Sequence, residues 1–215
     1  MINPLNRKNI LLSSTAILIS IFLLLLILPP EQSIGHVIKI VYLHAALVQT
    51  GLLLFLASAV LGLVSFFRKK SRWAKILSAS QKACLVVWSV YILSSTVVTK
   101  LAWGIWIAWE EPRVFASIVI WLAALLFGLL VLWIYNSRFT AFANIILASI
   151  AFWMTKTSGT IRHPLNPIGS SNSIMFKIFF LLIFFLILFL AIQLIRLFHQ
   201  QKNNRQGDMQ KSLPL

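Results

Sequence analysis

Segment 100–113 concentrates the side chains that are best suited to hold a flat ligand. It contains three tryptophans at intervals of three residues, then two glutamates and an arginine: Trp103, Trp106, Trp109, Glu110, Glu111 and Arg113. On a short helix, this spacing would align the indoles along one side, with Trp106 central and the charged groups near the end. An aromatic surface beside charged groups suits a planar amphipathic ligand. The alternative interpretation is an aromatic belt that only anchors the loop at a membrane interface.

Two of the four histidines are expected on the same face of the molecule as these tryptophans. His44 lies near the start of one long apolar segment, and His163 shortly precedes another. Neutral imidazole is a preferred axial ligand of haem iron, and two opposite histidines saturate the metal. The pair therefore predicts a bis-histidine haem site, whereas either residue alone would more commonly be a hydrogen-bonded interfacial histidine. His36 is assigned to a solvated loop, and His199 to the opposite face.

The elements that carry these residues are expected to be membrane-spanning helices. Of the 215 residues, 60% are hydrophobic and 11% are charged. These are more hydrophobic residues than a soluble protein of this size can bury in its core. Six segments approach the roughly 20 apolar residues needed to span a bilayer: 11–28, 40–67, 76–98, 114–135, 139–155 and 174–198. The sequence thus predicts an all-α bundle of six transmembrane helices over residues 1–198. Residues 199–215 are expected to form a polar, mobile tail.

The positions of the basic residues predict how the bundle is oriented. Most lie before the first segment, in the second and fourth connections, or after the last segment: Arg7, Lys8, Arg68, Lys69, Lys70, Arg72, Lys75, Arg138, Arg196, Lys202, Arg205 and Lys211. Lysine and arginine stay on the cytoplasmic side, so both termini are expected there and the tryptophan loop outside. The net charge of +15 therefore reflects topology and contact with anionic lipid, not nucleic-acid binding. The single cysteine, Cys84, excludes an intrachain disulfide framework.

The motifs resemble those of the cytochrome c maturation protein C group, within the wider cytochrome c assembly family. The matching residues are 42–44 (Tyr-Leu-His), 103–113 (WGIWIAWEEPR) and His163 with Pro164. The family carries a tryptophan-rich outer loop, the WWD domain, that holds haem between two outward-facing histidines. Glu110 stands where the family usually has aspartate, and Pro164 directly follows His163 where a glutamine usually intervenes. Because of these differences in the motifs, the chain resembles a divergent member of this group.

The resemblance implies a function, a cargo and partners. By this resemblance, His44 and His163 ligate haem b iron, while Trp103, Trp106 and Trp109 hold the porphyrin. Haem would pass from the outer face of a bacterial-type inner membrane to a periplasmic haem chaperone. The implied partners are the nucleotide-binding and permease subunits of an ATP-hydrolysing exporter, and a small single-helix membrane protein. The chain has no G-x-x-x-x-G-K-[ST] phosphate loop, so it is not expected to be the ATPase or an enzyme.

Several charged and polar residues near the site and within the membrane-spanning segments have more than one possible role. Lys100 or Arg113 is expected to pair with the haem propionates, and Glu110 to organise the loop for a partner. One alternative function is a haem b oxidoreductase that exchanges electrons with quinone. The other is a permease or assembly scaffold without haem, in which Lys82 and Asn144 would mark a pathway. The absorption spectrum of the purified protein would separate these alternatives.

Overall fold

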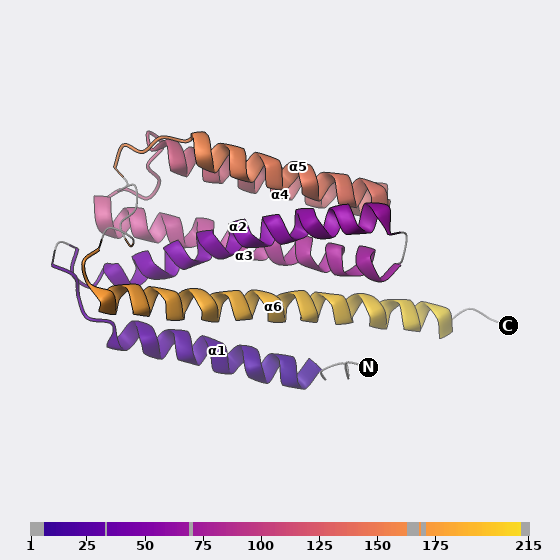
Figure 1. Cartoon of the computed structure of the whole chain (residues 1–215), viewed down its shortest axis with the longest axis horizontal. Helices are drawn as coiled ribbons and strands as arrows, with labels where there is room; N and C mark the ends of the chain where they lie inside the picture. The colour runs from indigo at the N-terminus through magenta and orange to yellow at the C-terminus, as the bar shows by residue number, and fades with distance from the viewer. Residues whose placement is uncertain (1–6, 33, 69–70, 163–167, 169–170, 212–215) are drawn as a thin grey trace.

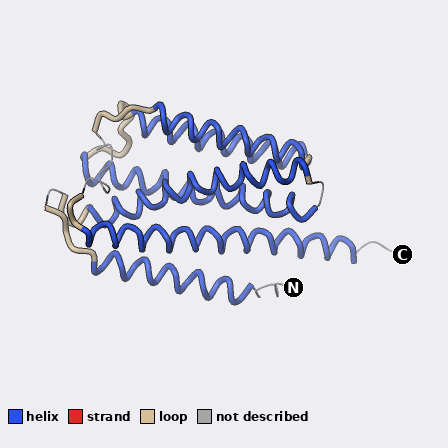
Figure 2. The backbone as a smooth tube through the Cα atoms, in the orientation of Figure 1, coloured by secondary structure: helices blue, strands red, loops and turns tan. Residues whose placement is uncertain are grey.

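The protein is an all-helical bundle in this computed structural model. The structure describes residues 7–211 except 33, 69–70, 163–167 and 169–170, with only the backbone at 71 and 201–211. The helices are α1 (Arg7–Ile27), α2 (Ile38–Phe67), α3 (Ser71–Trp103), α4 (Pro112–Ile134), α5 (Ser137–Thr157) and α6 (Ile174–Lys211). Each is long and apolar enough to cross a membrane (Figure 2). The predicted six-helix membrane fold is confirmed.

Two helices extend well beyond the apolar segments that predicted them. α3 continues through the polar residues after position 98 and ends at Trp103, and α6 continues to Lys211. Much of the tail that was expected to be mobile is therefore helical. Hydropathy detects only the lipid-buried part of a helix, whereas lysine, arginine and glutamine continue a helix well into water.

The connections divide the bundle into two ends of different charge. One end, which we call the Trp-loop end, carries the connections α1–α2, α3–α4 and α5–α6. The other, the terminal end, carries both chain termini and the connections α2–α3 and α4–α5 (Figure 1). The basic residues Arg7, Arg68 and Arg138 lie at the terminal end, whereas the Trp-loop end carries the acidic residues Glu31, Glu110 and Glu111 together with cations that include Lys100, Arg113 and Arg162. This arrangement agrees with the charge distribution predicted from the sequence.

The helices pack in layers around a central pair. α2 and α3 pack against each other, α4 and α5 cover one side of the pair, and α6 covers the other, with α1 packed on α6 (Figure 1). α2 runs obliquely, close to α6 at the Trp-loop end and close to α5 at the terminal end. Gly62 makes the second approach possible, because a Cβ there would lie 2.9 Å from the Ala141 carbonyl oxygen of α5. α2 and α5 therefore diverge toward the Trp-loop end.

The charge difference between the two ends predicts which end faces the cytoplasm. Ser137 is exposed at the terminal end and Asn172 at the Trp-loop end, so each can carry a reporter cysteine in a Cys84→Ser background. We expect an impermeant thiol reagent added to intact cells to label Asn172→Cys and not Ser137→Cys, because the basic end stays in the cytoplasm. A permeant reagent should label both. The reverse labelling pattern would show that the bundle is inserted with the opposite orientation.

Candidate functional site

The tryptophan segment is a loop, not the short helix that its spacing suggested. α3 ends because Gly104 takes a left-handed conformation, with φ of +78°, and its N–H donates to the Lys100 carbonyl at 3.1 Å. Residues 104–111 contain no helix, and the chain becomes helical again at Pro112, a residue suited to the first turn of α4. The expected stripe of three aligned indoles is therefore wrong: Trp103 ends a helix, whereas Trp106 and Trp109 lie in the loop.

The first half of the loop is bound to the end of α3. The Thr99 hydroxyl donates to the Trp106 carbonyl at 2.6 Å, and the Lys100 ammonium donates to the Gly104 carbonyl at 2.9 Å. The same ammonium lies 5.5 Å from the centre of the Trp106 ring, within cation–π range. Trp106 and Trp109 are nonetheless 62% and 63% exposed. These two indoles face outward, as interfacial tryptophans do.

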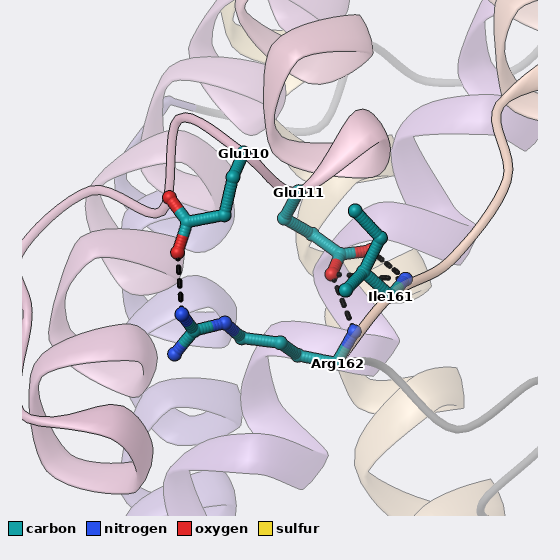
Figure 3. Close-up of polar contacts among 4 residues, drawn as sticks. All are labelled: Glu110, Glu111, Ile161 and Arg162. Atoms are coloured by element: carbon teal, nitrogen blue, oxygen red, sulfur yellow. Dashed lines mark hydrogen bonds and ion pairs between the residues drawn. The ribbon is translucent and has the colours of Figure 1, made fainter.

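The second half of the loop is bound to the α5–α6 connection through Glu111. This residue is the N-cap that directly precedes α4, yet its side chain makes no capping bond there and is fully buried. Its carboxylate accepts the backbone N–H of Arg162 at 2.7 Å and that of Ile161 at 3.2 and 3.3 Å to the two oxygens (Figure 3). Hydrogen bonds to a carboxylate are about twice as strong as neutral ones. Glu111 therefore fixes the backbone that directly precedes His163 in the sequence.

A second contact joins the same two segments at the surface. The Arg162 guanidinium lies 2.6 Å from the Glu110 carboxylate, and both side chains are nearly half exposed (Figure 3). The guanidinium carbon also lies 5.9 Å from the centre of the Trp103 ring. Arg162 thus connects the loop, the end of α3 and the α5–α6 connection. Solvent weakens this ion pair relative to the buried contacts of Glu111.

These segments cover a large cavity at the Trp-loop end. Its volume is about 740 Å³, and side chains from α2, α3, α4, α5, α6 and the loops line it. Of the predicted site residues, His44, Trp103 and Arg113 line this cavity. Trp106, Trp109, Glu110 and Lys100 are not among its lining residues, and His163 lies outside the described residues. A cavity of this size falls within the range of small-molecule and cofactor sites.

His44 is oriented in the cavity wall by contacts with α3. Its Nδ1 lies 3.2 Å from the Ser94 hydroxyl oxygen, and its ring lies 4.9 Å from that of Tyr91. The single hydroxyl hydrogen of Ser94 is donated to the Tyr91 carbonyl at 2.7 Å. The Ser94 oxygen is then left to accept from Nδ1 of His44, and in the neutral tautomer that donates from Nδ1 the lone pair is on Nε2. This is the tautomer in which Nε2 can ligate a metal.

Arg113 brings positive charge to the opposite wall. It follows Pro112 in the first turn of α4, and its carbonyl accepts from the Ser117 hydroxyl, which in turn lies 2.7 Å from the Tyr91 hydroxyl. Its Nε is buried and has no hydrogen-bond partner among the described residues. A buried donor left without a partner is costly, so this guanidinium is suited to an anionic group entering the cavity.

The other candidate residues of the sequence lie elsewhere. His36 is exposed in the α1–α2 loop, as predicted, and His199 lies within α6 at the terminal end. Lys82 is exposed on α3, where its long side chain can reach toward the interface. The buried Asn144 donates to the Thr140 carbonyl of its own helix at 2.8 Å, a structural contact.

Sequence reasoning assigned no individual role to three residues that organise the site. Glu111, Arg162 and Ser94 acquire their roles from partners distant in the sequence. The only signal for them was proximity to predicted site residues: Glu111 adjoins Glu110, and Arg162 adjoins His163. Neither a comparison with models of known protein families nor one with curated protein sequences finds a match to this chain.

The two neighbouring glutamates predict different consequences when each is replaced by alanine. Glu111→Ala should remove the charged acceptor of the N–H groups of residues 161 and 162, at a cost of about 1–3 kcal/mol. Glu110→Ala removes an exposed ion pair and should cost less than about 1 kcal/mol. Hydrogen exchange of these two amides in detergent or nanodiscs measures the difference. If the amides of residues 161 and 162 exchange equally slowly in the two variants, the role assigned to Glu111 is contradicted.

Proposed function

We propose that the chain is a haem-handling membrane protein, a divergent member of the cytochrome c maturation protein C group. It holds haem b in the cavity at the Trp-loop end, faces that end outward from a bacterial-type inner membrane, and passes the haem to an acceptor outside. The observation that carries this proposal is the composition of the cavity. The cavity is lined by a histidine whose Nδ1 contacts the Ser94 hydroxyl, by tryptophan, and by two arginines with one glutamate, Glu31.

The residues of the cavity suit each part of a haem molecule. The walls are mostly apolar and include the large rings of Trp88, Tyr91 and Trp103, which favour a porphyrin plane. His44 supplies an imidazole for the iron. Arg113 and Arg162 line the cavity near the loops, where their guanidinium groups can bind the two propionates. The sequence offers His163, next to Arg162, as the second imidazole.

The contacts of Arg162 suggest how the cavity residues take part in handover. Arg162 pairs with Glu110 in the structure and also lines the cavity, so a carboxylate inside the cavity competes with Glu110 for the same guanidinium. Loading would thereby free Glu110 at the surface, beside the exposed Trp109. We propose that this changed surface is what the periplasmic haem chaperone recognises. The exporter subunits and the small single-helix protein are proposed partners on the strength of the motifs alone.

The proposal predicts that His44 governs the haem spectrum. His44→Ala should lose the low-spin, six-coordinate spectrum and weaken haem retention by about tenfold or more, because one axial ligand is removed. Ser94→Ala should weaken retention by about 10-fold to 100-fold, because the ring loses the partner that sets its tautomer. Titration of the purified protein with haem measures both effects. His36→Ala is the control, and a loss of the low-spin spectrum in that variant with His44→Ala unaffected would refute the assignment.

The geometry also predicts that the three tryptophans are not equivalent. Trp103→Ala should weaken haem retention several-fold to tens of fold, because stacking on an aromatic face adds about 0.5–1.5 kcal/mol beyond the buried area. Trp106→Ala and Trp109→Ala should retain haem, because these residues do not line the cavity. This order differs from the one expected for an aligned stripe of indoles with Trp106 at its centre. Haem content at matched protein level distinguishes the two, and unchanged content in Trp103→Ala would exclude Trp103 as a haem contact.

A further inference from the structure

Gln49 is a polar residue in a position where a membrane helix normally has an apolar side chain that faces lipid. It is exposed and lies 11 residues after the start of α2 at Ile38. At 1.5 Å per residue this is about 16 Å along α2 from its start, within the segment that is long and apolar enough to cross a membrane. The same side chain lines the cavity. An amide at this depth is expensive in pure lipid and marks a wetter or functional environment.

Gln49 also belongs to the outward-facing stripe of α2. Residues at intervals of three and four continue from it along one helix face, and all are at least 42% exposed: Leu53, Leu56, Val60 and Leu63. A residue that belongs to this stripe and also lines the cavity marks a place where the cavity reaches the outer surface of the bundle. Leu56, seven residues further along the stripe, does not line the cavity.

The packing of the helices locates this opening. α2 packs against α3, α5 and α6, and α3 itself packs against both α5 and α6. The only side of α2 left for an exposed stripe is therefore the one between α5 and α6. These two helices lie on opposite sides of α2 in Figure 1, where α2 moves away from α5 toward the Trp-loop end. Thr155 of α5 and Phe180 of α6 line the cavity from the two sides.

We propose that the cavity opens sideways into the lipid bilayer between α5 and α6, with Gln49 at the rim, and takes an anionic amphiphile directly from the membrane. The apolar residues Val48 and Leu52 lie beside Gln49. The loop-covered end carries the cations Arg113 and Arg162 and one carboxylate, Glu31, so two positive charges there exceed one negative charge. An amphiphile in the bilayer has the same polarity, with its carboxylates at the interface and its apolar body deeper. It can therefore enter without inverting. The identification of this amphiphile as haem rests on the proposed function, whereas the opening itself does not.

The opening can be tested without haem by the reactivity of a thiol inside the cavity. Val98 of α3 is buried and lines the cavity, so Val98→Cys in a Cys84→Ser background is a suitable reporter. The probe is a lipid-soluble maleimide dissolved in proteoliposome membranes. Adding Gln49→Trp should slow labelling by about tenfold, because each passage must displace an indole from the rim. Gln49→Ala should label at least as fast as the parent.

The matched control is Leu56→Trp, which adds the same side chain to the same exposed stripe outside the cavity lining. Its labelling rate should equal that of the parent. All variants share one reporter thiol, so its intrinsic reactivity cancels in the comparison. If Gln49→Trp labels as fast as Leu56→Trp, the side opening is refuted.

A second arm uses the same variants in liposomes whose membranes contain haem, and follows the growth of the Soret band. A slower rise in Gln49→Trp alone supports haem loading from the bilayer. Equal rates in all variants would overturn loading through this opening and leave the proposed haem function standing. If no variant develops a Soret band while the labelling pattern holds, the side opening stands for another anionic amphiphile and the proposed haem function fails.

Discussion

The Trp-loop end depends on one buried carboxylate. Burying a charge is costly unless hydrogen bonds compensate it, and Glu111 is compensated by the backbone N–H groups of residues 161 and 162. The carboxylate thereby joins two connections that are far apart in the sequence and that both cover the cavity. Because backbone groups provide the donors, the contact fixes the path of the chain itself. The position of Arg162 beside Trp103 follows from this contact.

The space beneath these loops arises from helix packing. Gly62 lets α2 meet α5 closely near the terminal end, and the edge contacts of Tyr42 with Phe176 and Phe180 hold the other end of α2 near α6. α2 is thus inclined between two neighbours, and a wedge remains where it leaves α5. Helices without strong reasons to diverge close such a wedge, because lost contacts are costly. The inclination is therefore part of what maintains a cavity of about 740 Å³ in a protein of this size.

The sequence predicted the fold well and the site only in part. Six helices could be predicted because the bilayer imposes one length and one polarity on every span, and both are local properties. The loop could not, because one residue, Gly104, reverses the chain and separates Trp103 from the other indoles. Nor could sequence alone separate Glu110 from Glu111. They are chemically identical neighbours, and only their partners across the fold make one a surface ion pair and the other a buried acceptor.

The functional residues lie in an order that matches the depth of the membrane. Gln49 lies 11 residues into α2, His44 is just over one helical turn nearer the loops, and Arg113 and Arg162 lie at the loops themselves. Charge is cheapest where headgroups and water are close, and a neutral imidazole is tolerated deeper than a guanidinium. A ligand with an apolar body, a metal at its centre and carboxylates at one edge presents the same order. In the proposed haem site, the cost of placing each protein group in the membrane would therefore favour one orientation of the haem.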